Sequence, residues 1–239
     1  MATGRIHSYE TLGGLDGPGL RTVVFLQGCP LRCGYCHNPD TWDCRGGTEA
    51  TVQEVMGRIR RYRPYHGRSG GVTFSGGEPL AQADFVAELA AACAREGIHT
   101  ALDTAGYPLD PAVERAIDAC DLVILDVKHA DPGRYRELTG TAARGMREVL
   151  DFTVRTRKPT WIRQVVVPGW NDRPEDILAL ADLIRDHPAV ERAELLAYHT
   201  MGLQKWQVMG LLSPFAQTPP MSAEALAPLQ QLLDDALRQ

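Results

Sequence analysis

Apolar residues along the chain follow two alternating patterns. Short runs rich in β-branched residues, each followed by a turn, predict strands, whereas stretches with apolar residues every three to four positions predict helices. The predicted strands are 22–26, 71–75, 99–103, 122–127, 160–167 and 193–197. The predicted helices are 52–62, 83–96, 111–119, 144–156, 175–186 and 223–237. Strands and helices therefore alternate along almost the whole chain.

Three of these helices carry start signals in the sequence. Thr51, Asp110 and Ser222 stand where an N-cap residue belongs, since their side chains can accept a hydrogen bond from a free first-turn amide. Glu54 lies three residues after Thr51, which is the spacing of a capping box, and Pro111 stands at a first-turn position. These signals support helices that begin near residues 52, 111 and 223.

The apolar run at 122–127 is nearly continuous, so both faces of that strand must be covered. This favours a parallel sheet wrapped by helices over an antiparallel sandwich, and right-handed crossovers then curl the sheet. We therefore expect an α/β fold, a partial (β/α)6 TIM-like barrel of parallel strands with outer helices. With 239 residues, 44% of them hydrophobic, the chain can build one substantial core, and we expect a single domain over residues 1–239.

Composition narrows the range of partners. The net charge of −5 and an isoelectric point near 5.8 give no general attraction to polyanions, so neither nucleic acid nor an anionic membrane is expected as a partner. Residues 1–10 contain no apolar leader and no run is long enough to span a bilayer, so we expect a cytoplasmic protein. Three of the six cysteines fall within eight positions, which indicates metal ligands rather than a disulfide framework.

Cys29, Cys33 and Cys36 form a C-x3-C-x2-C array on the loop after the first predicted parallel strand. This spacing lets three thiolates converge on one polynuclear centre. A cubane cluster needs four ligands, so one iron is left open to a small molecule. An electron carrier normally has every iron closed off, and the open iron therefore predicts a cluster that takes part in chemistry.

Other metal and redox sites compete with this interpretation. A zinc site completed by His37 or Cys44 is the main alternative, but the chain has no second C-x2-C and His37 directly follows Cys36. A thioredoxin-like role for residues 33–36 is weaker, because these residues belong to a triad and no thioredoxin-like order surrounds them. An electron-transfer ferredoxin needs a fourth cysteine.

The segment Cys29-Pro-Leu-Arg-Cys33-Gly-Tyr-Cys36-His-Asn, with a later Gly-Gly-Glu-Pro, resembles the radical S-adenosylmethionine (SAM) superfamily. Asp16-Gly-Pro-Gly-Leu-Arg21 and Trp161-Ile-Arg163 resemble the pyruvate formate-lyase activating enzymes within it. The resemblance implies one reduced 4Fe-4S cluster that cleaves SAM to methionine and a 5'-deoxyadenosyl radical. That radical takes a hydrogen atom from a glycine of pyruvate formate-lyase. A flavodoxin or ferredoxin-type reductant and a monomeric enzyme are also expected.

The resemblance leaves other radical SAM activities open. Several activases of other glycyl-radical enzymes carry a ferredoxin-like insert, whereas only fourteen residues separate Cys36 from Thr51, so we expect a single radical SAM domain without that insert. The segment 197–206 departs from the commoner family form. An activase of another glycyl-radical enzyme, or a radical SAM enzyme that acts on a small molecule, therefore stays as an alternative.

Polar groups follow the predicted strands, at the edge where parallel sheets place active sites. Gly76 and Gly77 allow close backbone approach to a ligand, and the resemblance assigns them, with Glu78, to the methionine amino group of SAM. Alternation puts Asp126 and Lys128 on one face inside the curled sheet, where they should meet each other or a zwitterion. The resemblance places Lys128 near the methionine carboxylate and Asp126 near the amine.

A cation site is a second expectation at this edge. Asp103, Thr104 and Asp126 put oxygen atoms at the tips of neighbouring strands, a pattern suited to a hard cation near the substrate carboxylate. The resemblance implies a monovalent ion there, sodium or potassium. The competing interpretation is that these groups cap strands and turns.

The remaining candidates rest mainly on the resemblance. Tyr35 and His37 are expected to contact adenine or to pack the cluster loop, and His199 is the candidate for the nucleoside end. Arg163 is expected to touch the methionine carboxylate or to pair with a buried acid. Asp16, in a loop rich in turn formers, is the candidate contact to the glycine-bearing partner. Free cysteines outside the triad are interpreted as structural: Cys44, Cys93 and Cys120.

Overall fold

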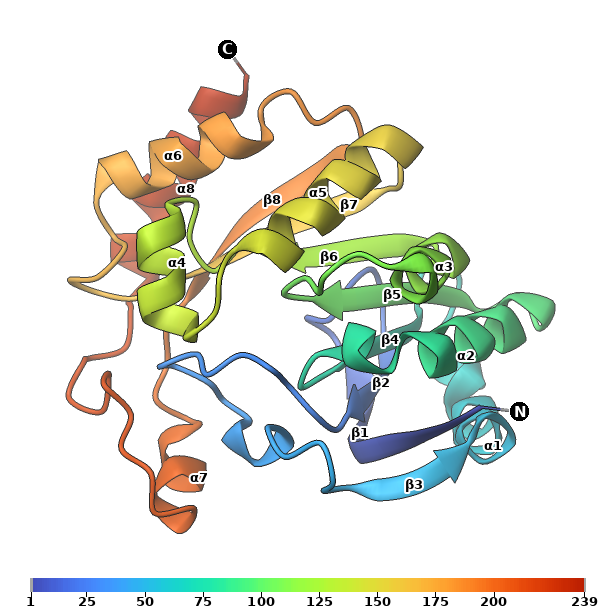
Figure 1. Cartoon of the computed structure of the whole chain (residues 1–239). Coiled ribbons are helices and arrows are strands. Elements are labelled where there is room, and N and C mark those ends of the chain that lie inside the picture. Colours follow the sequence, from blue (N-terminus) through green and yellow to red (C-terminus); the bar gives the residue numbers. More distant parts are fainter. Residues whose placement is uncertain (1, 239) are drawn as a thin grey trace.

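An eight-stranded sheet lies at the centre of the computed structural model, which describes residues 2–238 (Figure 1). Its strand order is β3-β1-β2-β4-β5-β6-β7-β8, in which β2 and β4 to β8 pair in parallel and β1 is antiparallel to both β2 and β3. The strands are β1 (Thr3–Gly13), β2 (Arg21–Leu26), β3 (Thr48–Thr51), β4 (Gly71–Gly76), β5 (His99–Thr104), β6 (Leu122–Asp126), β7 (Thr160–Val166) and β8 (Val190–Ala197).

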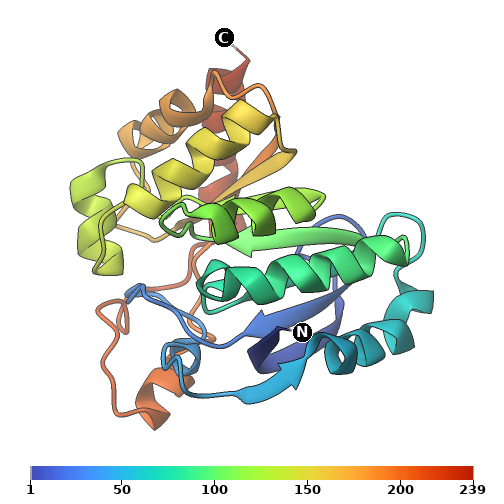
Figure 2. The same cartoon turned by 45° about the vertical axis from the view of Figure 1, so that its right-hand side comes forward.

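Helices connect the parallel strands and lie along the outer side of the curled sheet (Figures 1 and 2). The helices are α1 (Val52–Tyr62), α2 (Ala83–Arg95), α3 (Pro111–Ala119), α4 (Pro132–Thr139), α5 (Arg144–Thr156), α6 (Pro174–Ile184), α7 (Leu203–Val208) and α8 (Ala223–Leu237). Both α7 and α8 follow the last strand, and α7 lies apart from the outer layer (Figure 1). The outer strands β3 and β8 do not pair with each other, so the barrel stays open. The predicted α/β partial barrel is confirmed.

The six predicted parallel strands correspond to β2 and β4 to β8, with ends that differ by at most three residues. Four predicted helices, α1, α3, α5 and α8, have the predicted bounds. The capping box of α1 is also confirmed, because the Thr51 hydroxyl accepts from the Glu54 amide at 3.3 Å and the Glu54 carboxylate accepts from the Thr51 amide at 2.8 Å. Asp110 and Ser222 cap their helices as predicted.

The sequence patterns miss four elements: β1, β3, α4 and α7. Strand β3 has four residues, all at least partly exposed, and β1 is half exposed, so neither has a run of apolar residues. Helix α4 buries only Tyr135, Leu138 and Thr139, and α7 buries only Trp206. Such short elements are stabilised by contacts with the rest of the fold rather than by their own pattern.

Most of the apolar core lies between the sheet and the outer helices. Phe74 of β4, Leu102 of β5 and Met146 of α5 are fully buried there. Cys93 and Cys120 lie in the same core, as predicted for structural thiols, whereas Cys44 is exposed. None of the helices described is long and apolar enough to cross a membrane.

The capping box gives a test of the α1 boundary. Thr51→Ala removes the side-chain acceptor at the N-terminus of α1 and should lower the free energy of unfolding by about 1 kcal/mol. Thr51→Ser keeps the hydroxyl and should lie close to the wild type. Urea denaturation followed by circular dichroism measures both; equal losses in the two variants would show that the hydroxyl does not cap the helix.

Candidate active site

A cavity of about 520 Å³ opens where the parallel strands end. Side chains from the loop after β2, from the ends of β4 to β8 and from the β1–β2 connection line it. The predicted site residues along its wall are Asp16, Cys29, Cys33, Tyr35, Cys36, His37, Gly76, Gly77, Asp103, Asp126, Lys128, Arg163 and His199. The fold thus brings residues from most of the chain to one cavity.

The loop that carries the three cysteines is held by two of the helices that the sequence patterns miss. The Arg32 and Gly34 amides donate to the carbonyls of Thr139 and Leu138, at 2.7 and 3.0 Å, in the last turn of α4. These carbonyls have no partner within their own helix, so the loop satisfies the end of α4. On the other side, the Trp206 indole of α7 donates to the Cys36 carbonyl at 2.8 Å.

The three thiols are free and largely buried around the cavity. Burial raises the pKa of Cys29 and of Cys33 to about 12, and the nearby Lys128 ammonium acts in the opposite direction on Cys33. The metal-free thiols are therefore protonated at neutral pH. A metal ligand must be a thiolate, so binding of a cationic centre here is coupled to release of protons.

Asp126 and Lys128 meet in an ion pair at the end of β6, which is one of the two arrangements that alternation predicts. Burial alone lowers the pKa of Lys128, but the Asp126 carboxylate and other groups raise it well above its usual value. The Lys128 ammonium also lies 5.4 Å from the centre of the Tyr35 ring. Asp126 Oδ1 and the Tyr35 hydroxyl are buried without a hydrogen-bond partner in the described structure, so each can still bind a ligand.

Gly76 and Gly77 let the end of β4 approach the cluster loop directly. A Cβ atom on Gly76 would lie 2.2 Å from the Leu26 amide nitrogen, and one on Gly77 would lie 2.2 Å from the Gly28 carbonyl oxygen. The Gly77 amide donates to the Leu26 carbonyl at 2.9 Å. Any other residue here would push β4 away from the cysteine loop.

Two predicted residues, Glu78 and Thr104, have side chains outside the cavity. The Thr104 hydroxyl donates to Glu78 Oε1 at 2.6 Å, and the amides of Leu80 and Ala105 donate to the same carboxyl group. Strand alternation explains the difference, because Asp103 and Thr104 are neighbours on β5 and point to opposite faces. The Thr104 side chain therefore does not lie beside those of Asp103 and Asp126 at the cavity wall.

Asp103 does face the cavity and accepts from the Ser75 hydroxyl at 2.7 Å. Burial, and to a smaller extent the charge of Asp126, raises the pKa of Asp103. Among residues 2–238, no group of three His, Cys, Asp or Glu side chains is arranged to hold a single metal ion.

His37 and His199 stack face to face, with ring centres 3.9 Å apart and an angle of 16° between the planes. Burial, and next the charge of His199, lowers the pKa of His37 to about 4, so His37 is neutral at neutral pH. The Nδ1 atom of His199 is buried without a partner in the part of the chain described. The stack forms a flat, polar-edged wall of the cavity.

Arg163 lines the cavity and pairs with an acid that is only partly buried. Its Nε lies 3.3 Å from Glu194 Oε2 of β8, and its Nη2 donates to the Leu15 carbonyl at 2.6 Å. Sequence reasoning missed both partners. Glu194 lies two residues after Arg192 on a half-exposed strand, and this pattern gives no sign of a site.

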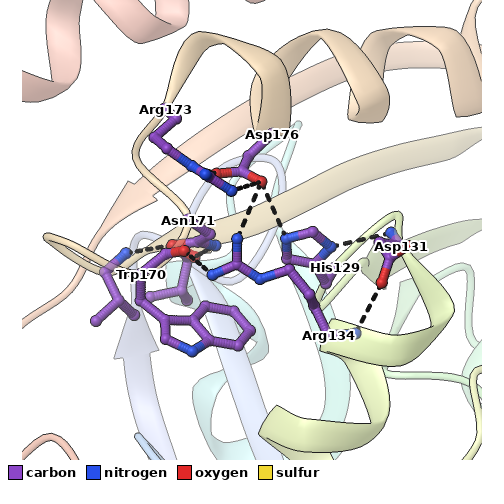
Figure 3. Close-up of polar contacts among 9 residues, drawn as sticks. His129, Asp131, Arg134, Trp170, Asn171, Arg173 and Asp176 are labelled. Carbon is purple, nitrogen blue, oxygen red and sulfur yellow. Dashed lines mark hydrogen bonds and ion pairs between the residues drawn. The ribbon is translucent and has the colours of Figure 1, made fainter.

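A polar cluster around Asp176 supports the cysteine loop from a distance (Figure 3). Asp176, at the start of α6, is 6% exposed and accepts from Arg173 Nε at 3.2 Å and Arg134 Nη1 at 3.4 Å. His129 Nε2 lies 3.5 Å from the same carboxylate, and the Arg134 guanidinium lies over the Trp170 ring at 4.7 Å. The cluster fixes the first turns of α4, whose last turn holds the cysteine loop.

Comparisons with known proteins agree with this geometry. The family model of the Radical SAM superfamily matches residues 23–183. The pyruvate formate-lyase-activating enzyme of Clostridium pasteurianum is 45% identical over 238 residues, which are 99% of this chain and 100% of that protein. The pyruvate formate-lyase 1-activating enzyme of Escherichia coli (strain K12) is 42% identical over 234 residues, 97% of this chain and 95% of that protein.

Solved structures support the fold. A domain of a pyruvate-formate lyase-activating enzyme from Bacteroides vulgatus has a TM-score of 0.57 and 26% identity, and the match covers 70% of this chain and 94% of that chain. Streptococcus suis SuiB bound to S-adenosylmethionine has a TM-score of 0.67 and 18% identity, with 89% and 46% covered. The second likeness concerns the fold alone.

The Asp176 cluster gives a testable prediction. Asp176→Asn removes the charge that three cationic or polar groups share, so the free energy of unfolding of the metal-free protein should fall by about 1–3 kcal/mol. Asp182→Asn on the same helix breaks only the exposed pair with Arg185 and should have almost no effect. Denaturant unfolding compares the two variants, and similar losses in both would contradict a supporting role for the cluster.

Glu78 predicts a pH dependence of stability. Burial raises the pKa of Glu78 from 4.5 to about 7 despite three hydrogen bonds that lower it. The folded state thus holds the Glu78 proton more tightly than the unfolded chain does. The resulting contribution to the free energy of unfolding is fully present below pH 4.5 and is lost as pH rises through about 7. The loss is on the order of 3 kcal/mol.

The contribution of Glu78 is measured by denaturant unfolding of the metal-free protein between pH 4.5 and 8, with the wild type compared to Glu78→Gln. The difference in the free energy of unfolding between the two proteins should shift against the wild type as pH rises. A difference that stays constant over this range would show that the Glu78 carboxyl has an ordinary pKa.

Proposed function

The chain belongs to the radical SAM superfamily and, within it, to the pyruvate formate-lyase-activating enzymes, and from this premise we propose that it forms the glycyl radical of a pyruvate formate-lyase. Family membership confirms the resemblance found in the sequence. The observation that carries the proposal is that the thiols of Cys29, Cys33 and Cys36 face the same cavity as the Asp126–Lys128 pair.

The superfamily uses a 4Fe-4S cluster and SAM, and the residues present fit both. Three free thiols line the cavity, and two buried polar atoms, Asp126 Oδ1 and the Tyr35 hydroxyl, have no partner in the described structure. When bound, the cluster and SAM supply a 5'-deoxyadenosyl radical, which takes a hydrogen atom from a glycine of the partner enzyme.

The ion pair of Asp126 and Lys128 suits the zwitterionic end of SAM. A carboxylate group is attracted to the Lys128 ammonium, and an ammonium group is attracted to the free Oδ1 of Asp126. Gly76 and Gly77 leave the neighbouring wall without side chains, so a ligand can approach the backbone. These groups bind and orient the methionine part of SAM.

The stack of His37 and His199 lies along another part of the same wall and suits the nucleoside end of SAM. A neutral His37 offers a flat, uncharged ring to an adenine. The Nδ1 atom of His199, which has no partner in the described structure, can form a hydrogen bond with a ribose or a base edge. Tyr35 lines the same cavity, and Arg163, paired with Glu194, adds a cationic group to its wall.

The proposal includes a monovalent cation, sodium or potassium, beside Asp103 and Asp126. Both carboxylates line the cavity, and burial, with a smaller effect of the Asp126 charge, raises the pKa of Asp103. A cation between them would remove that repulsion. Thr104 can take part only through its main chain, because its hydroxyl is bound to Glu78.

The proposed enzyme acts as a cytoplasmic monomer with a single radical SAM domain over residues 1–239. Only fourteen residues lie between Cys36 and Thr51, which leaves no length for a ferredoxin-like insert. A flavodoxin or ferredoxin-type protein would supply the electron, and Asp16 would contact the glycine-bearing segment of the partner from the cavity wall.

The proposal predicts a specific radical product. The protein, anaerobically reconstituted with iron and sulfide, reduced and mixed with SAM and pyruvate formate-lyase, should produce a glycyl radical signal in electron paramagnetic resonance (EPR). Cys33→Ala should abolish it, because the cluster loses one of three ligands. Cys44→Ala, at an exposed thiol outside the cavity, is the matched control and should retain the signal.

Deoxyadenosine formed without a glycyl radical on pyruvate formate-lyase would contradict the proposed partner while keeping the radical SAM chemistry. Equal loss of signal in Cys33→Ala and Cys44→Ala would contradict the assignment of the cluster ligands.

A further inference from the structure

Arg21, at the start of β2, is a fully buried cation that has no place in the SAM-binding wall. It is 0% exposed, and none of the ion pairs found among residues 2–238 includes it. Burial lowers its pKa to about 10, so the guanidinium is still charged at neutral pH. The carboxylates of Asp16 and Asp121 favour its charged form, but neither forms an ion pair with it, so the buried guanidinium depends on its hydrogen bonds.

The hydrogen bonds of Arg21 lead to the connection between β1 and β2. Its Nη1 donates to the Pro18 carbonyl at 2.9 Å and its Nε donates to the Thr73 hydroxyl at 2.6 Å. The Thr73 hydroxyl in turn donates to the Asp16 carbonyl at 2.6 Å. The Nη2 of Arg21 donates to the Val72 carbonyl of β4 at 2.6 Å, and this bond anchors the guanidinium to the sheet.

The glycines of this connection allow it to lie directly on the arginine. Gly17 has a φ of 127°, and a Cβ atom there would lie 3.0 Å from Arg21 Cδ and 3.1 Å from its Nε. Gly19 has a φ of 68°, and its Cβ would lie 2.5 Å from the Gly70 amide nitrogen. The turn-rich segment is therefore packed in one fixed arrangement rather than being a loose loop.

The outer side of the same segment is apolar and exposed. Leu15 is 86% exposed and yet borders the cavity, where Asp16 lies next to it. Leu12 and Leu20, on either side, are 53% and 45% exposed. The carbonyls of Asp16 and Pro18 are held by hydrogen bonds from inside the fold, so these apolar side chains stand on a fixed backbone. They form a preformed contact surface, and little conformational entropy is lost when a partner binds it.

We infer that Arg21 is a positioning residue that holds residues 14–20 as a preformed docking edge for the glycine-bearing protein partner. The inference rests on the proposed function, since the exposed Leu15 and its neighbour Asp16 line the cavity to which the partner would deliver its glycine. Arg21 acts through Thr73 and Pro18 and does not touch the partner itself, because it is completely buried.

Thr73→Val tests the anchor with the smallest change in shape. It removes the hydroxyl that links Arg21 to Asp16, and hydrogen–deuterium exchange of residues 13–20 should become roughly tenfold faster in the free protein. Thr153→Val, on α5, is the matched control. Thr153 is equally buried, and its hydroxyl also makes two hydrogen bonds, one to the Leu150 carbonyl and one to the His187 ring. Exchange in 13–20 should not change in this control.

The role in partner binding is tested with the reconstituted holoenzyme. Thr73→Val should raise the KM for pyruvate formate-lyase, read from the rate of glycyl radical formation, by about tenfold. The kcat and the slow partner-independent formation of deoxyadenosine should stay near wild type. Thr73→Ser, which keeps the hydroxyl between Arg21 and Asp16, should retain the wild-type KM and so separates loss of the anchor from a general effect of substitution at this position.

A partner KM that is unchanged in Thr73→Val, or that rises equally in Thr73→Ser, overturns the inference, as does an increase of equal size in Thr153→Val. Exchange in residues 13–20 that stays at the wild-type rate overturns the anchoring itself. A wild-type holoenzyme that cleaves SAM but forms no glycyl radical contradicts the proposed function, and the exchange experiment then still decides whether Arg21 holds the segment.

Discussion

The ion pair of Asp126 and Lys128 is the interaction on which the site depends. Two opposite charges lie inside the open barrel at the end of β6, close to Cys33 and Tyr35. The desolvation cost of burying such a pair is offset only if its remaining polar atoms also find partners. Asp126 Oδ1 has none in the described structure. The pair thus offers a free acceptor oxygen to a ligand with a positively charged donor, and we propose that the amino group of SAM is this donor.

The cysteine loop reaches this pair because short helices hold it from both sides. The last carbonyls of α4 accept the Arg32 and Gly34 amides, and the indole of α7 donates to Cys36. Helix α4 is itself fixed by the Asp176 cluster at its other end. The strand ends therefore supply the chemistry, whereas residues far from the cavity determine where the thiols lie.

The fold could be predicted largely from the sequence, because the parallel strands and most helices have apolar patterns long enough to recognise. The strand-end residues could be found because the strands themselves could be recognised. The three cysteines could be found because their spacing is a local pattern in the sequence. The side chain of Thr104 faces away from the cavity, because Asp103 and Thr104 are neighbours on β5 and alternate between its two faces. The supports of the site could not be predicted, since α4 has few buried residues and contacts such as Arg163 to Leu15 join positions distant in the sequence.

The most direct test of this account is a titration of the reduced, reconstituted protein with SAM, monitored through the EPR spectrum of the cluster. SAM should change the spectrum of the wild type at low concentration, because one iron has no protein ligand. Lys128→Met, which leaves Asp126 without its counter-ion, should require a much higher SAM concentration for the same change. A wild-type spectrum that SAM leaves unchanged, or identical titrations of the two proteins, would contradict the account.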